Sequence, residues 1–362
     1  MNDTYKLPSL FELGDIQTKS VLKLAAKAHK VLGEVKGLSA TIPNQYILIG
    51  TLALQEAKES SAIENIITTH DDIYRSDYES KIFVSHNAKE VHCYAQALQA
   101  GFKIVKDSSI LTNNTLIAIQ NILEGNDAGF RKQAGTKLKN DQTGEVIYTP
   151  PQEPQLVVHY MTELEKFIND EDNKSDYDDL VKMALIHHQF ESIHPFYDGN
   201  GRTGRILNIL YLVKQGLLET PILYLSRYIN KNKDKYYELL QYVRDSNDWE
   251  PWLLYMLTAV EVTSKQTITI INEMKLLITK CKTLIKKEEP KIYSHELINN
   301  LFKHPYTKID FVVNDLQVHR NTAQKYLTAL TNIGILHKHK IGTENYYLNT
   351  ELFKLLSNVG DY

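Results

Sequence analysis

Apolar residues recur at spacings of three and four positions along most of this 362-residue chain, and that helical period is the feature that most restricts its fold. Residues 107–123 and 177–190 follow it, and a further helix is expected to begin at about Gly201. Such a succession of amphipathic helices predicts a mainly α-helical protein. Nearer the start of the chain, the same pattern runs through Val21, Leu24, Ala25, Ala28, Leu32, Leu48, Leu52, Ala53 and Glu56.

One segment departs from this period. Residues 136–139 and 145–148 have the pattern of two short strands around a loop that ends in Gly144, and Pro150 and Pro151 stop the second strand. We therefore predict a β-hairpin embedded among helices. A disordered loop is the alternative interpretation of the same residues.

The C-terminal part of the chain differs in pattern from the rest. A charged run from Lys286 to Pro290 marks a boundary. Beyond it, helices are predicted over 295–302, 311–316 and 321–333, followed by an alternating pair of strands that reaches Tyr347. This order of elements is typical of a winged helix-turn-helix module.

Charge, cysteine content and hydropathy exclude several classes of protein. The formal net charge of −3 argues against a chain that is polycationic throughout, although a local basic surface stays compatible with it. Cys93 and Cys281 are the only two cysteines and lie 188 positions apart, so they indicate neither a disulfide framework nor a cysteine-based zinc site. The first residues lack the apolar region of a signal peptide, and no apolar run approaches the roughly 20 residues of a membrane helix. We expect a cytoplasmic protein with no membrane contact.

The stretch from His194 to Arg205, which reads HPFYDGNGRTGR, carries most of the chemical information. Gly199 and Gly201 allow a tight turn and a close approach of the backbone to a ligand. If a helix begins here, its first N–H groups face the loop and form a cradle for an anion. Arg202 and Arg205 are three positions apart, so on a helix they share a side and could bind neighbouring phosphates.

Two further groups of the same stretch suit a transfer reaction. Asp198 offers the hard oxygen ligand that a magnesium ion prefers. His194 is the residue type that accepts a proton from a hydroxyl near neutral pH. Each residue alone also has an ordinary structural interpretation, as a turn, a solvated cation or a buried histidine, but together they favour transfer of a nucleotide or phosphoryl group to an alcohol.

The same stretch resembles the signature of Fic-domain proteins, His-Pro-Phe-x-Asp-Gly-Asn-Gly-Arg-x-x-Arg. The resemblance implies an enzyme that uses ATP and Mg²⁺ and moves AMP onto a Ser, Thr or Tyr hydroxyl of a target protein. It implies that His194 is the base and Asp198 the metal ligand. It places the other nucleotide-binding residues in one run: a cradle for the α- and β-phosphates (Gly199, Asn200, Gly201), the outer-phosphate arginines Arg202 and Arg205, and Thr203 and Gly204 between them.

The resemblance also divides the chain and gives the hairpin a role. It implies an N-terminal helical region over 1–109, a Fic core over 110–256, a helical linker over 257–285 and the winged helix-turn-helix over 286–362. Family members use a hairpin just before the signature as a flap that pairs with the target's backbone, so the identity of the target is not readable. Arg131, Pro150 and Pro151 resemble family positions beside this flap, and turn and cap chemistry is an equal alternative for them.

An upstream segment resembles the inhibitory motif of the same family, Ser/Thr-x-x-x-Glu-Gly/Asn, with Ser60, Glu64 and Asn65 at the specified positions. Ser60 and Glu64 are four apart and share a helix face. The resemblance implies that Glu64 competes for Arg205 and so keeps ATP in an unproductive pose. A solvated amphipathic helix is the alternative, and Glu64 could also support removal of AMP.

Several other residues have weaker claims. A metal site at His187 and His188 is less favoured than packing, because no cysteine is near and the helix is apolar. Similarity to the family suggests an adenine-binding wall that includes Tyr228, Asn230 and Lys231, although packing of aromatic residues explains it equally well.

The C-terminal module could bind DNA through His319, Arg320 and Lys325. Its ten Lys and Arg residues face eight Asp and Glu residues over 286–362, which is a weak overall charge for that purpose, so protein contact or a homodimer competes with DNA.

Three functions therefore remain at this point. The first is an auto-inhibited protein adenylyltransferase, able to modify itself. The second is an enzyme that transfers a different phosphate-containing group, and the third is a DNA-binding regulator whose core only senses nucleotide. Parallel incubations with ATP labelled at the α-phosphate and ATP labelled at the γ-phosphate would distinguish these three functions.

Overall fold

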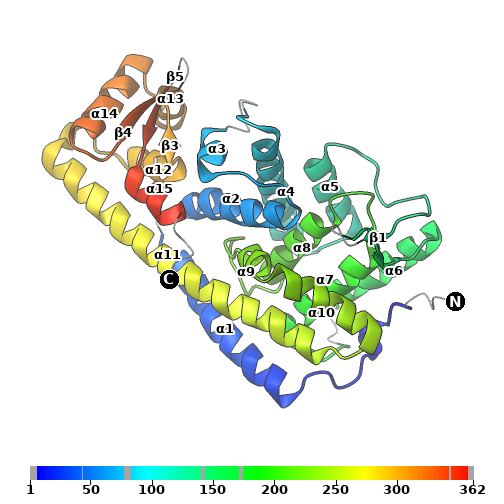
Figure 1. Cartoon of the computed structure of the whole chain (residues 1–362). Coiled ribbons are helices and arrows are strands. Elements are labelled where there is room, and N and C mark those ends of the chain that lie inside the picture. The colour runs from blue at the N-terminus through cyan, green and yellow to red at the C-terminus, as the bar shows by residue number, and fades with distance from the viewer. Residues whose placement is uncertain are drawn as a thin grey trace.

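The computed structural model describes residues 6–42, 44–76, 83–139, 143–170, 174–341 and 344–357. The protein is mainly helical with a small β-hairpin, as predicted (Figure 1). The elements up to the hairpin are the 3₁₀ helix η1 (Leu10–Glu12) and helices α1 (Lys19–Ser39), α2 (Gln45–Ile63), α3 (His70–Arg75), α4 (His86–Ser108) and α5 (Asn113–Glu124). After it follow α6 (Pro154–Ile168), α7 (Asp179–Ile193), α8 (Asn200–Lys214), α9 (Leu225–Lys231), α10 (Lys233–Ser246) and α11 (Glu250–Glu288).

Helices α7 and α8 form the centre of the molecule and carry the signature between them. Every side chain of α7 from Leu180 to Ile193 is buried. A helix that is covered on all sides needs no polar face, which explains its weak amphipathic pattern. On α4, a Cβ added to Gly101 would lie 2.6 Å from Leu210 of α8, so the glycine lets these two helices pack closely.

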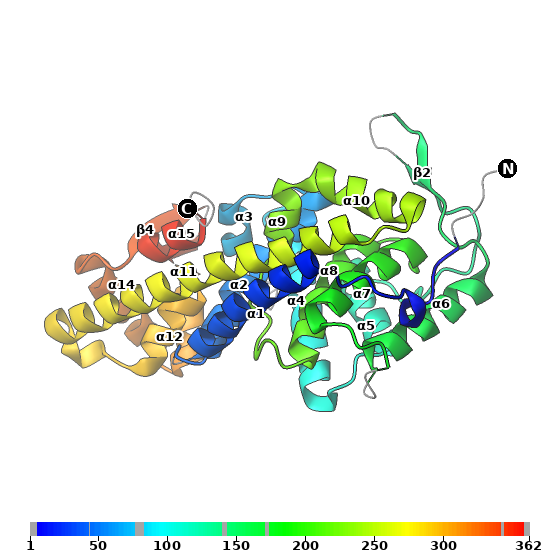
Figure 2. The ribbon, with the colours of Figure 1, turned by 90° about the horizontal axis from the view of Figure 1, so that it is seen from below.

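Two long helices pack together along one side of the core. The first, α1, begins after Thr18, whose hydroxyl accepts a hydrogen bond from the Val21 N–H at 3.3 Å. It lies beside α11 in both views (Figures 1 and 2). Helix α11 continues without interruption through the predicted boundary at 256/257 and extends to the C-terminal module.

The hairpin consists of β1 (Leu138–Lys139) and β2 (Val146–Tyr148), which pair in antiparallel fashion. Residues 140–142 of its predicted loop lie outside the described residues. The Tyr148 hydroxyl donates to the Ser192 carbonyl at 2.8 Å, and the Arg244 guanidinium lies 3.9 Å from the centre of the Tyr148 ring. These contacts fix the base of the hairpin to the end of α7, directly before His194.

The C-terminal module contains the three predicted helices and the predicted pair of strands in the expected order. It comprises η2 (Pro290–Ile292), α12 (His295–Lys303), β3 (Tyr306–Thr307), α13 (Ile309–Leu316), α14 (Arg320–Asn332), β4 (His337–Ile341), β5 (Glu344–Leu348) and α15 (Thr350–Ser357). Of these, η2, β3 and α15 are additional elements. Within the described residues, its strands form an antiparallel sheet in the order β3-β5-β4. Helix α12 packs on α2, and the Phe353 ring of α15 packs edge-on against Tyr74 of α3.

One predicted helix is wrong in its extent. The prediction ran a helix over 107–123, whereas α4 ends at Ser108 and α5 begins only at Asn113. Ser109 adopts a left-handed backbone with φ of 59°, and the Thr112 hydroxyl caps α5 by accepting from the Thr115 N–H at 3.3 Å. Serine and threonine end and start helices through such local bonds, which apolar spacing does not register. No described helix has the length and apolar character that crossing a membrane requires.

Candidate active site

The loop between α7 and α8 is held in one shape by its own residues. His194 ends α7 in a left-handed conformation with φ of 50°, and Gly199 starts α8 with φ of 76°. The Asn200 side chain closes the loop, since it accepts from the Phe196 N–H at 2.8 Å and donates to the Phe196 carbonyl at 2.9 Å. The signature asparagine therefore lies buried beneath the loop, and the backbone above it is rigid.

The His194 imidazole is neutral in this environment. Burial, together with the nearby guanidinium groups of Arg131 and Arg244, lowers its pKa to about 4. A histidine with such a pKa is unprotonated at pH 7, which is the state that a general base requires.

Arg131 connects the hairpin to the histidine loop. Its Nε donates to the His194 carbonyl at 2.8 Å, and its Nη2 donates to the carbonyls of Ile193, at 3.3 Å, and Pro151. Its own N–H donates to the Pro195 carbonyl at 2.8 Å. From the sequence, a family role and turn chemistry are equal alternatives for Arg131 and Pro151. The geometry makes Arg131 a clamp across the base of the hairpin.

Glutamate side chains crowd the two glycines at the start of α8. A Cβ on Gly201 would collide with the Glu64 carboxylate and lie 2.9 Å from Arg205 Nη1, and a Cβ on Gly199 would collide with Glu124. Gly199 has no side chain to cap the helix, so the first N–H groups of α8 lack a side-chain cap. Uncapped N–H groups at a helix start are suited to an anion, and the phosphate cradle expected from the sequence stays a prediction.

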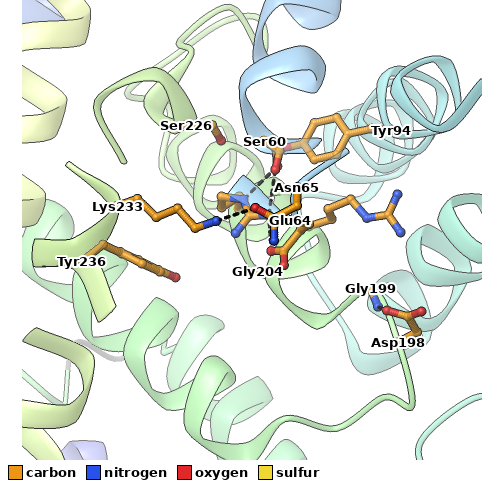
Figure 3. A network of polar contacts seen from close by, with 12 residues as sticks. Ser60, Glu64, Asn65, Tyr94, Asp198, Gly199, Gly204, Ser226, Lys233 and Tyr236 are labelled. Atoms are coloured by element: carbon orange, nitrogen blue, oxygen red, sulfur yellow. Dashed lines mark hydrogen bonds and ion pairs between the residues drawn. The ribbon is translucent and has the colours of Figure 1, made fainter. Parts of the chain in front are cut away.

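Arg205 is buried, with 2% of its side chain exposed, and it contacts both ends of the upstream motif. Its Nε donates to the Ser60 hydroxyl at 2.8 Å. Its Nη2 donates to the Ser60 carbonyl at 3.1 Å and to Glu64 Oε1 at 2.7 Å (Figure 3). Arg205 therefore lies against Ser60 and Glu64, although more than 140 positions separate it from each of them in the sequence.

Glu64 is ionised in this position. Burial by itself would raise the pKa of Glu64, but the charge and the hydrogen bond of Arg205 outweigh burial and hold the pKa below its usual value. Asn65 follows with φ of 62°, and its Oδ1 accepts from Lys233 Nζ of α10 at 3.1 Å (Figure 3). A left-handed residue just after α2 suits asparagine or glycine, which explains both residue types at this motif position.

Helix α2 is anchored one turn before Ser60 by a residue to which sequence analysis gave no role. The fully buried Glu56 carboxylate accepts from the Tyr94 hydroxyl at 3.0 Å, from the Ser226 N–H at 3.0 Å and from the Ser226 hydroxyl. Burial raises its pKa to about 7, against the effect of these bonds. Its place in an apolar stripe was the available signal, because a glutamate among core positions needs buried partners.

Arg202 is fully engaged by protein carboxylates. Its Nη1 donates to Glu90 Oε2 and its Nη2 to Glu124 Oε1, both at 2.7 Å, and 6% of its side chain is exposed. The guanidinium thus ties α8 to α4 and α5. The structure separates the two predicted clamping arginines, since Arg202 pairs with Glu90 and Glu124 while Arg205 pairs with Glu64.

The remaining signature residues have distinct environments. Asp198 is exposed, and its Oδ1 accepts from the Gly199 N–H at 2.7 Å (Figure 3). Thr203 is buried, and its N–H donates to the Gly199 carbonyl at 2.9 Å. At Gly204, a Cβ would lie 2.5 Å from Glu191 Oε1, so this glycine permits α7 and α8 to approach each other.

The structure fits the expected metal through one carboxylate. Among the described residues, no group of three or more His, Cys, Asp or Glu side chains is arranged to hold a metal ion. Mg²⁺ is commonly bound by one or two carboxylates together with substrate phosphates, so Asp198 beside the anion cradle is a suitable donor set.

The histidines of α7 have packing roles, as favoured from the sequence. His187 contacts the Tyr236 hydroxyl at 2.8 Å and stacks on Trp252, and His188 contacts the Leu240 carbonyl at 3.1 Å. In the wall proposed for adenine, Asn230 donates to Glu59 Oε2 at 2.8 Å, which adds a second link between α9 and α2.

Comparisons with known proteins agree with this geometry. A model of the Fic/DOC family matches residues 110–212, and a model of the Fic/DOC family N-terminal region matches 22–103. A model of the C-terminal domain of SoFic-like protein adenylyltransferases matches residues 277–352.

Proteins with similar sequences are named protein adenylyltransferases. The chain is 29% identical over 195 residues to a probable protein adenylyltransferase of Aquifex aeolicus, which covers 52% of this chain and 54% of that protein. It is 25% identical over 230 residues to protein adenylyltransferase fic-1 of Caenorhabditis briggsae, which covers 61% of this chain and 41% of that protein. The chain thus spans about half or less of these relatives' length.

A solved structure shares the fold. A Fic family protein from Desulfovibrio desulfuricans superimposes with a TM-score of 0.58 at 20% identity, over 92% of this chain and 97% of that one.

Proposed function

Because this chain belongs to the Fic/DOC family, we propose that it is a protein adenylyltransferase that moves AMP from ATP to a Ser, Thr or Tyr hydroxyl of a target protein, and that Glu64 restrains it. The observation that carries the proposal is the contact of Arg205 with Glu64 at 2.7 Å, at the start of a glycine-lined helix. A guanidinium beside an anion cradle serves a polyphosphate, and here a carboxylate occupies it.

The reaction needs one base, and His194 supplies it. Its neutral imidazole takes the proton from the target hydroxyl as the oxygen attacks the α-phosphorus of ATP. A bond forms between that oxygen and the α-phosphorus, the bond from the α-phosphorus to the bridging oxygen breaks, and pyrophosphate leaves. The low pKa of His194 keeps the imidazole ready to accept the proton at neutral pH.

The start of α8 binds the phosphates. The N–H groups that follow Gly199, which no side chain caps, would stabilise the negative charge of the α- and β-phosphates, and Asp198 would hold Mg²⁺ against them. When bound, Mg²⁺ neutralises phosphate charge and orients the leaving group. Arg205 would bind the γ-phosphate once Glu64 leaves it, whereas Arg202, held by Glu90 and Glu124, would position α8.

The hairpin would present the target. The base of the hairpin lies next to the histidine loop, because Arg131 and Tyr148 bind the backbone around His194. A target segment added as a further strand would bring its hydroxyl toward His194 through main-chain hydrogen bonds, which place few demands on the target's sequence.

Parallel labelling with [α-³²P]ATP and [γ-³²P]ATP tests the transferred group. The Glu64→Gly variant, incubated with Mg²⁺, is expected to label itself and proteins of a cell extract from the α-label only. A matched incubation with His194→Ala/Glu64→Gly should remain unlabelled. Transfer of the γ-label would establish phosphorylation instead, and label from neither source would leave no adenylyltransferase activity to explain.

A further inference from the structure

The charges of the C-terminal module are strongly segregated along its sequence. Residues 316–343 contain four Lys and Arg residues and three histidines but no Asp or Glu. The rest of the module, over 286–315 and 344–362, contains six Lys residues and eight Asp and Glu residues. The small net charge of the whole module is therefore an average over a basic stretch and an acidic remainder.

The basic stretch coincides with two elements of the fold. Helix α14 buries Ala323, Leu327 and Leu330 against the module. Its exposed side carries four polar residues at helical spacing, namely Asn321, Gln324, Lys325 and Thr328. This face therefore offers two amides, an ammonium group and a hydroxyl, all of which form hydrogen bonds with polar partners.

Strand β4 adds a basic edge. All four residues from His337 to Lys340 are exposed. In the described part of the sheet, β4 pairs with β5 alone, so its other edge is open. Both α14 and β4 lie at the end of the molecule opposite the hairpin (Figures 1 and 2).

The chemistry of this face distinguishes between classes of partner. Protein interfaces are built around aromatic and aliphatic side chains. Among the described residues that follow Leu276 in the sequence, no large apolar side chain is strongly exposed. The C-terminal module therefore shows no apolar centre of this kind. Phosphate backbones are bound by Lys and Arg, and amide side chains bind base edges in the major groove, which admits a helix.

The geometry points to α14 and β4 as a binding surface for double-stranded DNA. Asn321, Gln324 and Lys325 would face the major groove, and Lys338 and Lys340 would contact phosphates. Arg320 contributes less, because it already pairs with Asp310 at 2.5 Å. This inference does not depend on adenylyl transfer, and its test contains no ATP.

Fluorescence anisotropy with a labelled random-sequence 30-base-pair duplex measures the binding. The full chain is titrated at NaCl concentrations between 50 and 200 mM, as wild type and as Lys338→Ala/Lys340→Ala. If both lysines contact phosphates, the slope of log K against log salt becomes shallower by about 1.8, at about 0.9 for each contact. Lys287→Ala/Lys354→Ala is the control, since it removes two exposed lysines elsewhere on the module.

Each result of the titration either supports or overturns the inference. The inference is supported by duplex binding whose slope changes in Lys338→Ala/Lys340→Ala and not in the control, with weaker binding also in Lys325→Ala. It is overturned if the wild type does not bind the duplex at 50 mM NaCl, or if both double variants change the slope equally. Tighter binding to single-stranded DNA or to duplex RNA also overturns it.

Discussion

Replacing Glu64 by glycine removes the carboxylate from Arg205 and should raise self-modification and target modification. A hydrogen bond between charged groups is worth about 1.5–3 kcal/mol net. Because 36% of the Glu64 side chain is exposed, solvent screening places the value near the lower end, at about 1.5 kcal/mol. That free energy corresponds to an increase of about tenfold in the population with a free Arg205, and so in transfer rate.

Two matched variants locate the origin of the increase. Glu64→Gln keeps an oxygen that can accept from Arg205 but loses the charge, so its rate is expected between those of the wild type and Glu64→Gly. Arg205→Ala in the Glu64→Gly background should lose the gain, because the phosphate ligand is then absent.

The assay is the initial rate of incorporation from [α-³²P]ATP at saturating Mg²⁺, with thermal unfolding as the control for folding. Equal rates for the wild type and Glu64→Gly would refute the restraint. A Glu64→Gln rate as high as that of Glu64→Gly would show that charge alone accounts for it.

Three further predictions concern the base and the helix that carries Glu64. In the Glu64→Gly background, His194→Ala should lower transfer at least 100-fold while ATP affinity, measured by calorimetry, changes little; undiminished turnover would remove His194 from the chemistry. The pKa of His194 in the folded protein is lowered to about 4, so this residue stays a proton acceptor well below pH 6.5. The value of kcat/KM should therefore be constant from pH 8 to about pH 5. A fall in kcat/KM centred at pH 6.5 would contradict this. Tyr74→Phe removes the hydroxyl to which the Gln55 side chain donates at 2.6 Å, so it should lower Tm while basal transfer stays within twofold of the wild type. Asn65→Ala should raise basal transfer about fivefold, because a left-handed alanine costs about 1 kcal/mol or more. A larger rise in basal transfer for Tyr74→Phe than for Asn65→Ala would contradict the role given to the turn after Ile63.

Local patterns predicted most of the fold. Helical spacing located α1 and, in the C-terminal module, α12, α13 and α14, because one buried face is enough to produce that spacing. It also located α2 and α7, although α7 is buried on every side. The break between α4 and α5 escaped detection, since Ser109 and Thr112 act through single hydrogen bonds and a backbone angle. Helix α11 runs through the predicted boundary at 256/257 and packs against α1, and no local pattern records that packing.

The site was readable where its residues are consecutive and unreadable where they come from distant elements. His194 to Arg205 form one loop and helix start, so composition and spacing describe them. The carboxylates that hold Arg202 lie 112 and 78 positions away, at Glu90 and Glu124, and only the packing of α4 and α5 on α8 brings them together. Charge counting cannot assign such partners.

The contacts along α2 indicate where the restraint would be released. Glu56 and Ser60 lie inside the helix, buried and bonded to α9, α4 and Arg205, and their displacement would leave several buried polar groups unpaired. Glu64 lies beyond the helical end at Ile63, in a turn whose Glu64 and Ile66 N–H groups donate to the Ser61 carbonyl at 3.0 Å. Besides the bond of Glu64, a side-chain bond in this turn joins Asn65 to Lys233 and is exposed. An exposed bond contributes little, about 0–1 kcal/mol. Release therefore requires only the turn after Ile63 to move while α2 stays in place, so a trigger need act on no more than this turn and the start of α10.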